Sequence, residues 1–138
     1  PTPSKPGQVF GSGGPTTSGR MDAYSPRLIK LGLHAMIGKG YRNDAVKKAI
    51  VDYHGVYFGA IGGAGAMMSS CIEECEVIAF DDLGPEAIRK LKVKNMPLVV
   101  VIDHLGNDLY EIGRKNYLKN AAKMSLSSRL LDATTAQI

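Results

Sequence analysis

The sequence predicts one α/β domain with a mixed, partly parallel sheet. Short apolar segments alternate with helical patterns of about ten residues, which is typical of α/β proteins that pair some strands in parallel. The composition agrees, because 44% of the 138 residues are hydrophobic and 22% are charged, as in ordinary globular domains. A chain of this length can bury its own core, so we expect residues 1–138 to form a single domain.

The N-terminal part of the chain is predicted to be an arm followed by a helix. Residues 1–13 are rich in proline, glycine and serine, which favours an extended arm. A helix can begin with Thr16 or Thr17 as its N-cap. Pro26 interrupts this segment, so either the helix kinks there or a second helix starts with Ser25 as its N-cap.

The middle of the chain alternates strands and helices. Residues 34–37 are predicted to form a short buried strand, and Asn43 is placed to cap a helix whose apolar residues follow helical spacing. A second strand is expected at 56–60 and a short helix at 62–72. A third strand is expected at 75–80.

The C-terminal part is predicted to contain the strongest strand of the chain. Residues 84–91 are expected to form a short helix that opens at a Gly-Pro-Glu sequence. The apolar run at 98–103 predicts a strand buried on both faces. Residues 109–112 are its expected hairpin partner, and 115–138 form a tail that is expected to be helical and amphipathic over 115–132.

Charge, cysteine content and hydropathy narrow the class of function. The net charge of +4 comes from scattered residues, which suits a small anionic ligand and argues against nucleic acid. The two cysteines, Cys71 and Cys75, lack metal-site spacing, and the three histidines lie far apart, so no metal site is predicted. No apolar run has the length of about 20 residues that a membrane span needs, and no signal peptide is evident, so we expect a cytoplasmic protein without membrane contact.

Three glycine-rich turns, at 13–19, 38–40 and 62–65, lie at expected strand ends or helix starts. Ligands of open α/β sheets bind at such positions. The turn around Lys39 does not have Walker A spacing, and the third turn does not have the G-x-G-x-x-G spacing of dinucleotide sites. The turns are therefore either tight strand-to-helix connections or parts of one ligand site.

The stretch from Gly14 to Tyr24 places two threonines, a serine and Arg20 in one turn. A helix N-terminus presents free N–H groups and positive potential, so with Arg20 it can hold a carboxylate or a phosphate. The alternative is a helix cap beside a surface arginine. Lys39, between two glycines, is likewise either a ligand contact or a surface lysine in a turn.

The sequence Gly-Pro-Thr-Thr-Ser-Gly-Arg-Met-Asp-Ala-Tyr at 14–24 resembles the signature of the class I, iron–sulfur fumarate hydratases and the L(+)-tartrate dehydratases. The similarity is to their C-terminal domain, which is a separate beta subunit in two-subunit members. It continues in the same order through 36–40, 57–66, 83–88 and 101–108, and it covers roughly residues 3–112.

The resemblance implies a three-layer β/β/α swivelling domain and a hydro-lyase of the citric acid cycle type. The implied reaction is the reversible hydration of a C4 dicarboxylate, with fumarate and malate or tartrate as substrates. An alpha subunit would hold a [4Fe–4S] cluster through three cysteines, with one iron open to substrate as a Lewis acid. Since this chain has only two cysteines, we expect it to act only with that subunit, in a homo- or hetero-oligomer.

By position, the resemblance implies that Thr16 moves the proton at the carbon next to the carboxylate. It also implies that Arg20 and Lys39 bind substrate carboxylates. The candidate substrate site further includes Thr17, Gly19, Gly62 and Gly63. From the residues alone, a stand-alone module that binds an anion or a nucleotide remains the alternative.

Overall fold

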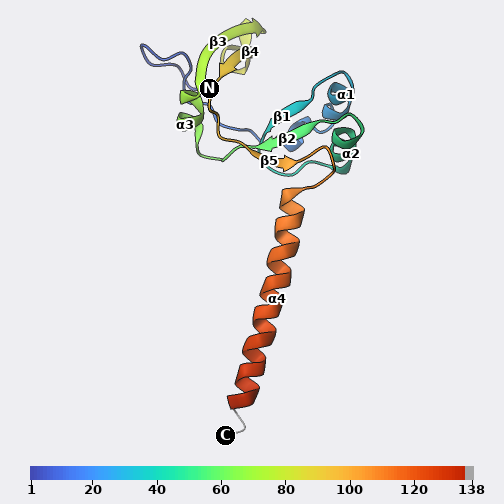
Figure 1. The fold of residues 1–138 in the computed structure, drawn as a ribbon. Helices are drawn as coiled ribbons and strands as arrows, with labels where there is room; N and C mark the ends of the chain where they lie inside the picture. The colour runs from blue at the N-terminus through green and yellow to red at the C-terminus, as the bar shows by residue number, and fades with distance from the viewer. Residues whose placement is uncertain (136–138) are drawn as a thin grey trace.

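The structure is a computed structural model that describes the backbone of residues 1–135 and the side chains of residues 1–122. It confirms the mixed α/β class, with parallel and antiparallel strand pairs. Within residues 1–135 the strands form two separate small sheets, one with three strands and one with two. In Figure 1 the helices α1 and α2 lie beside the three-stranded sheet, and the long helix α4 projects away from it.

The three-stranded sheet has the order β1-β2-β5. Strand β1 (Ala35–Gly38) pairs in parallel with β2 (Val56–Gly59), and β2 pairs in antiparallel with β5 (Val99–Ile102). A parallel pair needs a crossover connection, and helix α2 (Asp44–Asp52) supplies it. Asn43 caps this helix as predicted, because its side-chain oxygen accepts a hydrogen bond of 2.9 Å from the Val46 N–H.

The hydrophobic core lies between this sheet and its two helices, α1 (Ser25–Lys30) and α2. Its buried side chains are Ile29, Val46, Ala49, Ile50, Tyr57, Val101 and Ile102. Met36 and Tyr110 pack against them. This cluster fixes β1 and β2, and with them the turns that follow each strand.

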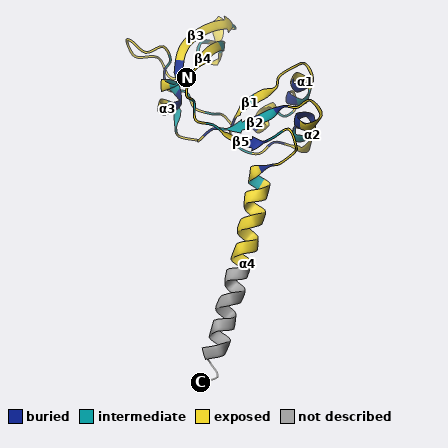
Figure 2. Cartoon of the chain, viewed as in Figure 1, coloured by how far each residue is buried: buried dark blue, intermediate teal, exposed yellow. Residues whose placement is uncertain are grey.

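The burial expected for two of these strands is wrong. The sequence predicts a buried strand at 34–37 and a strand at 98–103 buried on both faces. In the structure, Ile37 and Val99 are each 52% exposed. The physical reason is that α1 and α2 contribute to one core cluster and leave the rest of the sheet uncovered, as the yellow segments of Figure 2 show.

The segment around Pro26 forms two helices rather than one kinked helix. A 3₁₀ helix, η1 (Ser18–Met21), is followed by α1, whose first turn contains Pro26. Proline fits there because the first turn of a helix has no intrahelical partner for its N–H. The Ser25 hydroxyl donates a hydrogen bond of 2.9 Å to the Met21 carbonyl, so it joins the two helices instead of capping α1.

The two-stranded sheet pairs β3 (Ile72–Ala79) with β4 (Ile88–Val93) in antiparallel. Helix α3 (Gly65–Ser70) leads into it, and the 3₁₀ segment η2 (Asp81–Glu86) connects its strands. The helix predicted at 84–91 is therefore wrong. Gly84 has φ of +53° and interrupts the helical turn, after which β4 pairs Lys90 with Glu76 and Lys92 with Glu74.

Helix α4 (Leu109–Thr135) begins where the sequence predicts a hairpin strand at 109–112, so that prediction is wrong. Asp108 causes the change, because its Oδ1 accepts a hydrogen bond of 3.0 Å from the Tyr110 N–H and caps a helix there. Only an isolated bridge between Ile102 and Asp108 remains of the expected pairing. The helix has 27 residues, which corresponds to about 40 Å.

The expected tail of 115–138 lies within α4 up to Thr135, and residues 136–138 lie outside the described residues. Figure 2 shows the described part of α4 as exposed beyond its first turn. Among residues 1–135, no helix combines the length and the apolar content that crossing a membrane requires.

Candidate functional site

The turn that contains Thr16 and Thr17 runs alongside the end of β1. The Ser18 N–H donates a hydrogen bond of 3.0 Å to the Lys39 carbonyl, and the Lys39 N–H donates one of 3.1 Å to the Thr16 carbonyl. Thr17 and Lys39 thereby form a parallel bridge. The structure thus brings together two of the predicted site segments, which are more than twenty positions apart in the sequence.

Gly38 permits this close approach. A Cβ atom added to Gly38 would lie 1.8 Å from Ser18 Oγ and 3.3 Å from the Thr16 carbonyl oxygen. Real Cβ atoms do not approach other atoms so closely, so residue 38 must lack a side chain for the turn to sit on β1. Gly40 has φ of +84°, a left-handed conformation that glycine adopts readily.

The third glycine turn lies next to the Lys39 side chain. A Cβ atom added to Gly62 would lie 4.0 Å from Lys39 Nζ and 3.9 Å from its Cδ. The backbone connects them as well, because the Ala60 N–H donates a hydrogen bond of 2.8 Å to the Gly38 carbonyl. Gly63 follows with φ of +82° and nothing within 4 Å of an added Cβ. The turns at 16–20, 38–40 and 62–63 therefore form one contiguous region.

The polar side chains of this region are available to a ligand. Thr16, Thr17, Arg20 and Lys39 are all exposed. Among the side chains that the structure describes, neither Arg20 nor Lys39 forms a hydrogen bond or an ion pair. Thr17 occupies the N-cap position of η1 but makes no side-chain cap bond, so its hydroxyl is also uncommitted.

The predicted helix-terminus contribution to anion binding is smaller than expected. Helix η1 has four residues and 3₁₀ geometry, whereas the macrodipole argument assumes several aligned α-helical turns. The positive charge of the region therefore comes mainly from Arg20 and Lys39. Gly19, on the same turn, lies against the Tyr41 carbonyl, since an added Cβ there would be 3.5 Å from that oxygen.

A buried polar network under the two turns was not found from the sequence. Arg42 is 4% exposed, and its Nε donates a hydrogen bond of 2.6 Å to Asp22 Oδ1. Its Nη2 donates one of 2.7 Å to Ser25 Oγ, and its guanidinium carbon lies 5.1 Å from the centre of the Tyr57 ring. The only hint in the sequence is that Arg42 directly precedes the Asn43 cap. An arginine at such a position is ordinarily interpreted as a solvent-exposed charge.

Tyr57 extends this network to the turn of Ser18. The buried Tyr57 hydroxyl forms hydrogen bonds of 3.1 Å with Ser18 Oγ and with the Gly40 carbonyl oxygen. Burial raises the pKa of the Tyr57 hydroxyl, so the group is neutral at physiological pH. It therefore holds both turns through uncharged hydrogen bonds.

Surface hollows lie beside Thr16. One, of about 580 Å³, is bounded by the N-terminal arm, the three-stranded sheet and β4, and Thr16 lies on its wall. Another, of about 250 Å³, is lined by Thr16, Ser18 and Arg42 among others. Arg20 and Lys39 line neither hollow. Both side chains are exposed on the protein surface.

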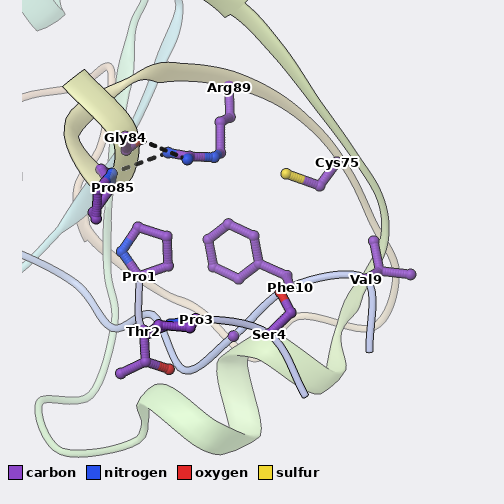
Figure 3. A pocket seen from close by; sticks show the side chains of 11 residues that line it. Pro1, Thr2, Pro3, Ser4, Val9, Phe10, Cys75, Gly84, Pro85 and Arg89 are labelled. Carbon is purple, nitrogen blue, oxygen red and sulfur yellow. Dashed lines mark hydrogen bonds between the residues drawn. The ribbon is translucent and has the colours of Figure 1, made fainter. Parts of the chain in front are cut away.

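A third hollow, of about 290 Å³, contains none of the predicted site residues. Figure 3 shows it between the N-terminal arm, which carries Pro1 and Phe10, and the two-stranded sheet of β3 and β4, which carries Cys75 and Arg89. The Arg89 guanidinium is occupied, because it donates hydrogen bonds of 2.7 Å to the Gly84 carbonyl and 3.1 Å to the Pro85 carbonyl. The Arg89 side chain is therefore committed to the backbone of the 84–87 turn.

The described residues do not fit an iron–sulfur cluster. Over the described side chains, no group of three or more histidine, cysteine or acidic residues is placed to hold a metal ion. A cluster of four irons is held by cysteine thiolates, and this chain has only Cys71 and Cys75, both free and partly buried. A cluster would need its ligands from elsewhere.

Residues 1–113 match the family described as "Fumarase C-terminus". The chain is 39% identical over 113 residues to "Fumarate hydratase 1, mitochondrial" of Leishmania major, which covers 80% of this chain and 21% of that protein. It is 37% identical over 113 residues to "Fumarate hydratase class I, aerobic" of Escherichia coli (strain K12), which covers 80% of this chain and 21% of that protein.

A shorter relative matches over a larger share of its length. The chain is 40% identical over 111 residues to "Putative L(+)-tartrate dehydratase subunit beta" of Methanocaldococcus jannaschii, which covers 77% of this chain and 57% of that protein. The chain therefore spans about a fifth of the fumarate hydratases and somewhat over half of this subunit.

Proposed function

The chain belongs to the family of the fumarase C-terminus, and we propose that it forms the beta-type part of a hydro-lyase that hydrates and dehydrates a C4 dicarboxylate. The observation that carries this proposal is the pairing of Ser18 and Lys39 through the backbone, which places the Arg20 and Lys39 turns side by side. Both cations are exposed and lack partners among the described side chains.

Arg20 and Lys39 have complementary roles in binding the carboxylates. Arginine presents a planar fork that binds a carboxylate through two parallel hydrogen bonds, whereas lysine acts as a point charge. Arg20 would therefore fix the orientation of one carboxylate, and Lys39, beside Gly62, would attract the second. Because Gly62 and Gly63 have no side chains, they leave room for the carbon chain of the ligand to approach the Lys39 ammonium group.

Thr16 is the group proposed to move the proton at the carbon next to the carboxylate. Its carbonyl accepts a hydrogen bond from the Lys39 N–H, and Thr16 lines two of the surface hollows. An unaided threonine hydroxyl is a weak base, but the nearby positive charges favour its ionised form. Thr17 and Gly19 complete the turn around the substrate.

The iron–sulfur cluster is assigned to a partner chain, because the residues described here do not fit it. The name of the relative from Methanocaldococcus jannaschii, a subunit beta, supports a two-chain enzyme of this kind. Fumarate and malate are the proposed substrates, and tartrate is the alternative of the same size and charge.

The test is an anaerobic assay of the protein together with its cluster-bearing partner chain, with fumarate, malate and tartrate as substrates. We expect Arg20→Ala to lower kcat/KM by about a hundredfold, because a bidentate carboxylate contact is lost. Arg27→Ala is the matched control, since Arg27 is an exposed arginine on the adjoining helix α1. Full turnover by Arg20→Ala would refute the site assignment. If the complete enzyme turned over none of the three substrates, the proposed function would be refuted.

A further inference from the structure

We propose that Asp22 and Arg42 are positioning residues that set the separation of Arg20 and Lys39. This inference rests on the proposed function, because it concerns the same carboxylate site. Asp22 follows Arg20 by two positions, and Arg42 follows Lys39 by three. The ion pair between them, with 2.6 Å from Arg42 Nε to Asp22 Oδ1, therefore connects the segment that carries Arg20 to the segment that carries Lys39.

Both oxygens of the Asp22 carboxylate accept hydrogen bonds from the segment that follows the Lys39 turn. Oδ1 accepts from Arg42 Nε, and Oδ2 accepts a hydrogen bond of 2.7 Å from the Asn43 backbone N–H. Both donors are on consecutive residues, so the carboxylate is oriented as well as bound. Hydrogen bonds to a charged group are roughly twice as strong as those between neutral groups, which makes this the strongest connection between the turns.

Arg42 is itself fixed on its other sides. Its Nη2 donates to Ser25 Oγ at 2.7 Å, and its Nη1 lies 3.3 Å from the Met36 sulfur. The Tyr57 ring lies 5.1 Å from the guanidinium carbon. Arg42 is 4% exposed, and its Nε and Nη2 are committed to Asp22 and Ser25, so we expect it to affect binding through the turns rather than by direct contact with the substrate.

The dicarboxylate makes this geometry important. Its two carboxylates are a fixed few bonds apart, so both cations bind it well only at one separation. A displacement of about 1 Å in a positioned group can cost a hundredfold in rate. The pair Asp22–Arg42, with the Tyr57 hydroxyl bonded to both Ser18 and Gly40, restricts such a displacement.

The test substitutes Asp22→Asn in the complete enzyme. Asparagine keeps the size but places an NH₂ group against the Arg42 or Asn43 donor, so one of the two contacts is lost. Because Arg20 and Lys39 would bind the carboxylates in the ground state as well as in the transition state, we expect KM for the dicarboxylate to rise about a hundredfold with kcat changed much less. A substitution that only destabilised the fold would lower apparent kcat through loss of folded enzyme and leave KM unchanged, and that result would overturn the proposal.

Two further measurements separate this proposal from the proposed function. In hydrogen exchange, the Ser18 and Lys39 amides should exchange about tenfold faster in Asp22→Asn, whether or not the enzyme hydrates fumarate. Asp52→Asn is the matched control, because it breaks an exposed ion pair with Lys48 of 2.8 Å. Unchanged exchange at both amides would refute the positioning role even in an active enzyme.

Tyr57→Phe is the milder second variant, since it removes one oxygen and keeps the ring. It should raise KM in the same direction by about tenfold, through loss of the hydrogen bonds to the turns of Ser18 and Gly40. An unchanged KM in both Tyr57→Phe and a folded Asp22→Asn would overturn the proposal.

Discussion

Replacing Gly38 by alanine tests the contact on which the site depends. The new methyl carbon would lie 1.8 Å from Ser18 Oγ, in a place where the turn at 16–18 rests on the end of β1. Ser18 is buried and is bonded to the Tyr57 hydroxyl, so it has little freedom to move aside. The turn must therefore shift away from β1, and its two backbone hydrogen bonds to Lys39 weaken.

The size of the effect follows from three terms. Forcing an extra methyl group into a packed site costs about 1–3 kcal/mol. Weakening the bonds between Ser18 and Lys39 and between Lys39 and Thr16 adds about 1 kcal/mol each at most. Alanine also restricts the unfolded chain, which stabilises the folded state by about 0.4–1 kcal/mol. This gain applies here because residue 38 does not have a positive φ, so alanine can adopt its backbone conformation. We expect a net loss of about 3 kcal/mol of unfolding free energy.

Urea unfolding followed by circular dichroism measures this loss, since a chain of 138 residues is within the range of two-state behaviour. Gly113→Ala is the matched control. An added Cβ at Gly113 meets nothing within 4 Å, and the residue lies in α4, so alanine should stabilise by up to about 1 kcal/mol. Ser18→Ala combined with Gly38→Ala should recover part of the loss. An unfolding midpoint for Gly38→Ala equal to that of the unaltered chain would refute the reasoning.

Two further predictions concern groups outside the turns of the candidate site. Because burial raises the pKa of Tyr57, the folded state keeps its proton at a pH where the unfolded state loses it, so stability should fall as pH rises above about 10. An ultraviolet titration should show one of the six tyrosines ionising last, and Tyr57→Phe should remove that late step. Lys47→Met should destabilise the start of α4 by about 2 kcal/mol, because the Lys47 ammonium lies 2.9 Å from the buried Asp108 Oδ2 and also bonds Glu111. Urea unfolding checks this value, with the exposed neighbour Lys48→Met as the control.

The sequence predicted local structure well where a single residue controls it. Asn43 caps α2 as predicted, and Pro26 lies in the first turn of a separate helix, which was one of the two alternatives that the sequence left open. The segment 84–91 was mispredicted because Gly84 and Pro85 are typical of both a helix start and a turn. The alternation of lysines with Leu91 and Val93 was the better signal, since it has the period of a strand.

The sequence alone indicates the charged residues of the candidate site, but not the residues that support them. Arg20 and Lys39 belong to motifs that are visible in the sequence, and the structure places their turns together. Arg42 belongs to no motif, and its burial depends on Asp22 and Ser25, which are about twenty positions away along the chain. A single sequence does not contain that pairing, because it arises only when α1 packs against α2.

The charge pattern of the β3–β4 ribbon determines how copies of the chain can meet. Glu74 and Glu76 lie on β3, and Lys90 and Lys92 lie opposite them on β4, with Lys92 bonded to Glu74 at 2.7 Å. Within the described residues the ribbon has two strands, so each has an outer edge without a strand partner. Two β4 edges brought together would set lysine against lysine, and two β3 edges would set glutamate against glutamate, both of which are unfavourable. The ribbon therefore repels the like edges of its own copies while its internal pairs hold it together.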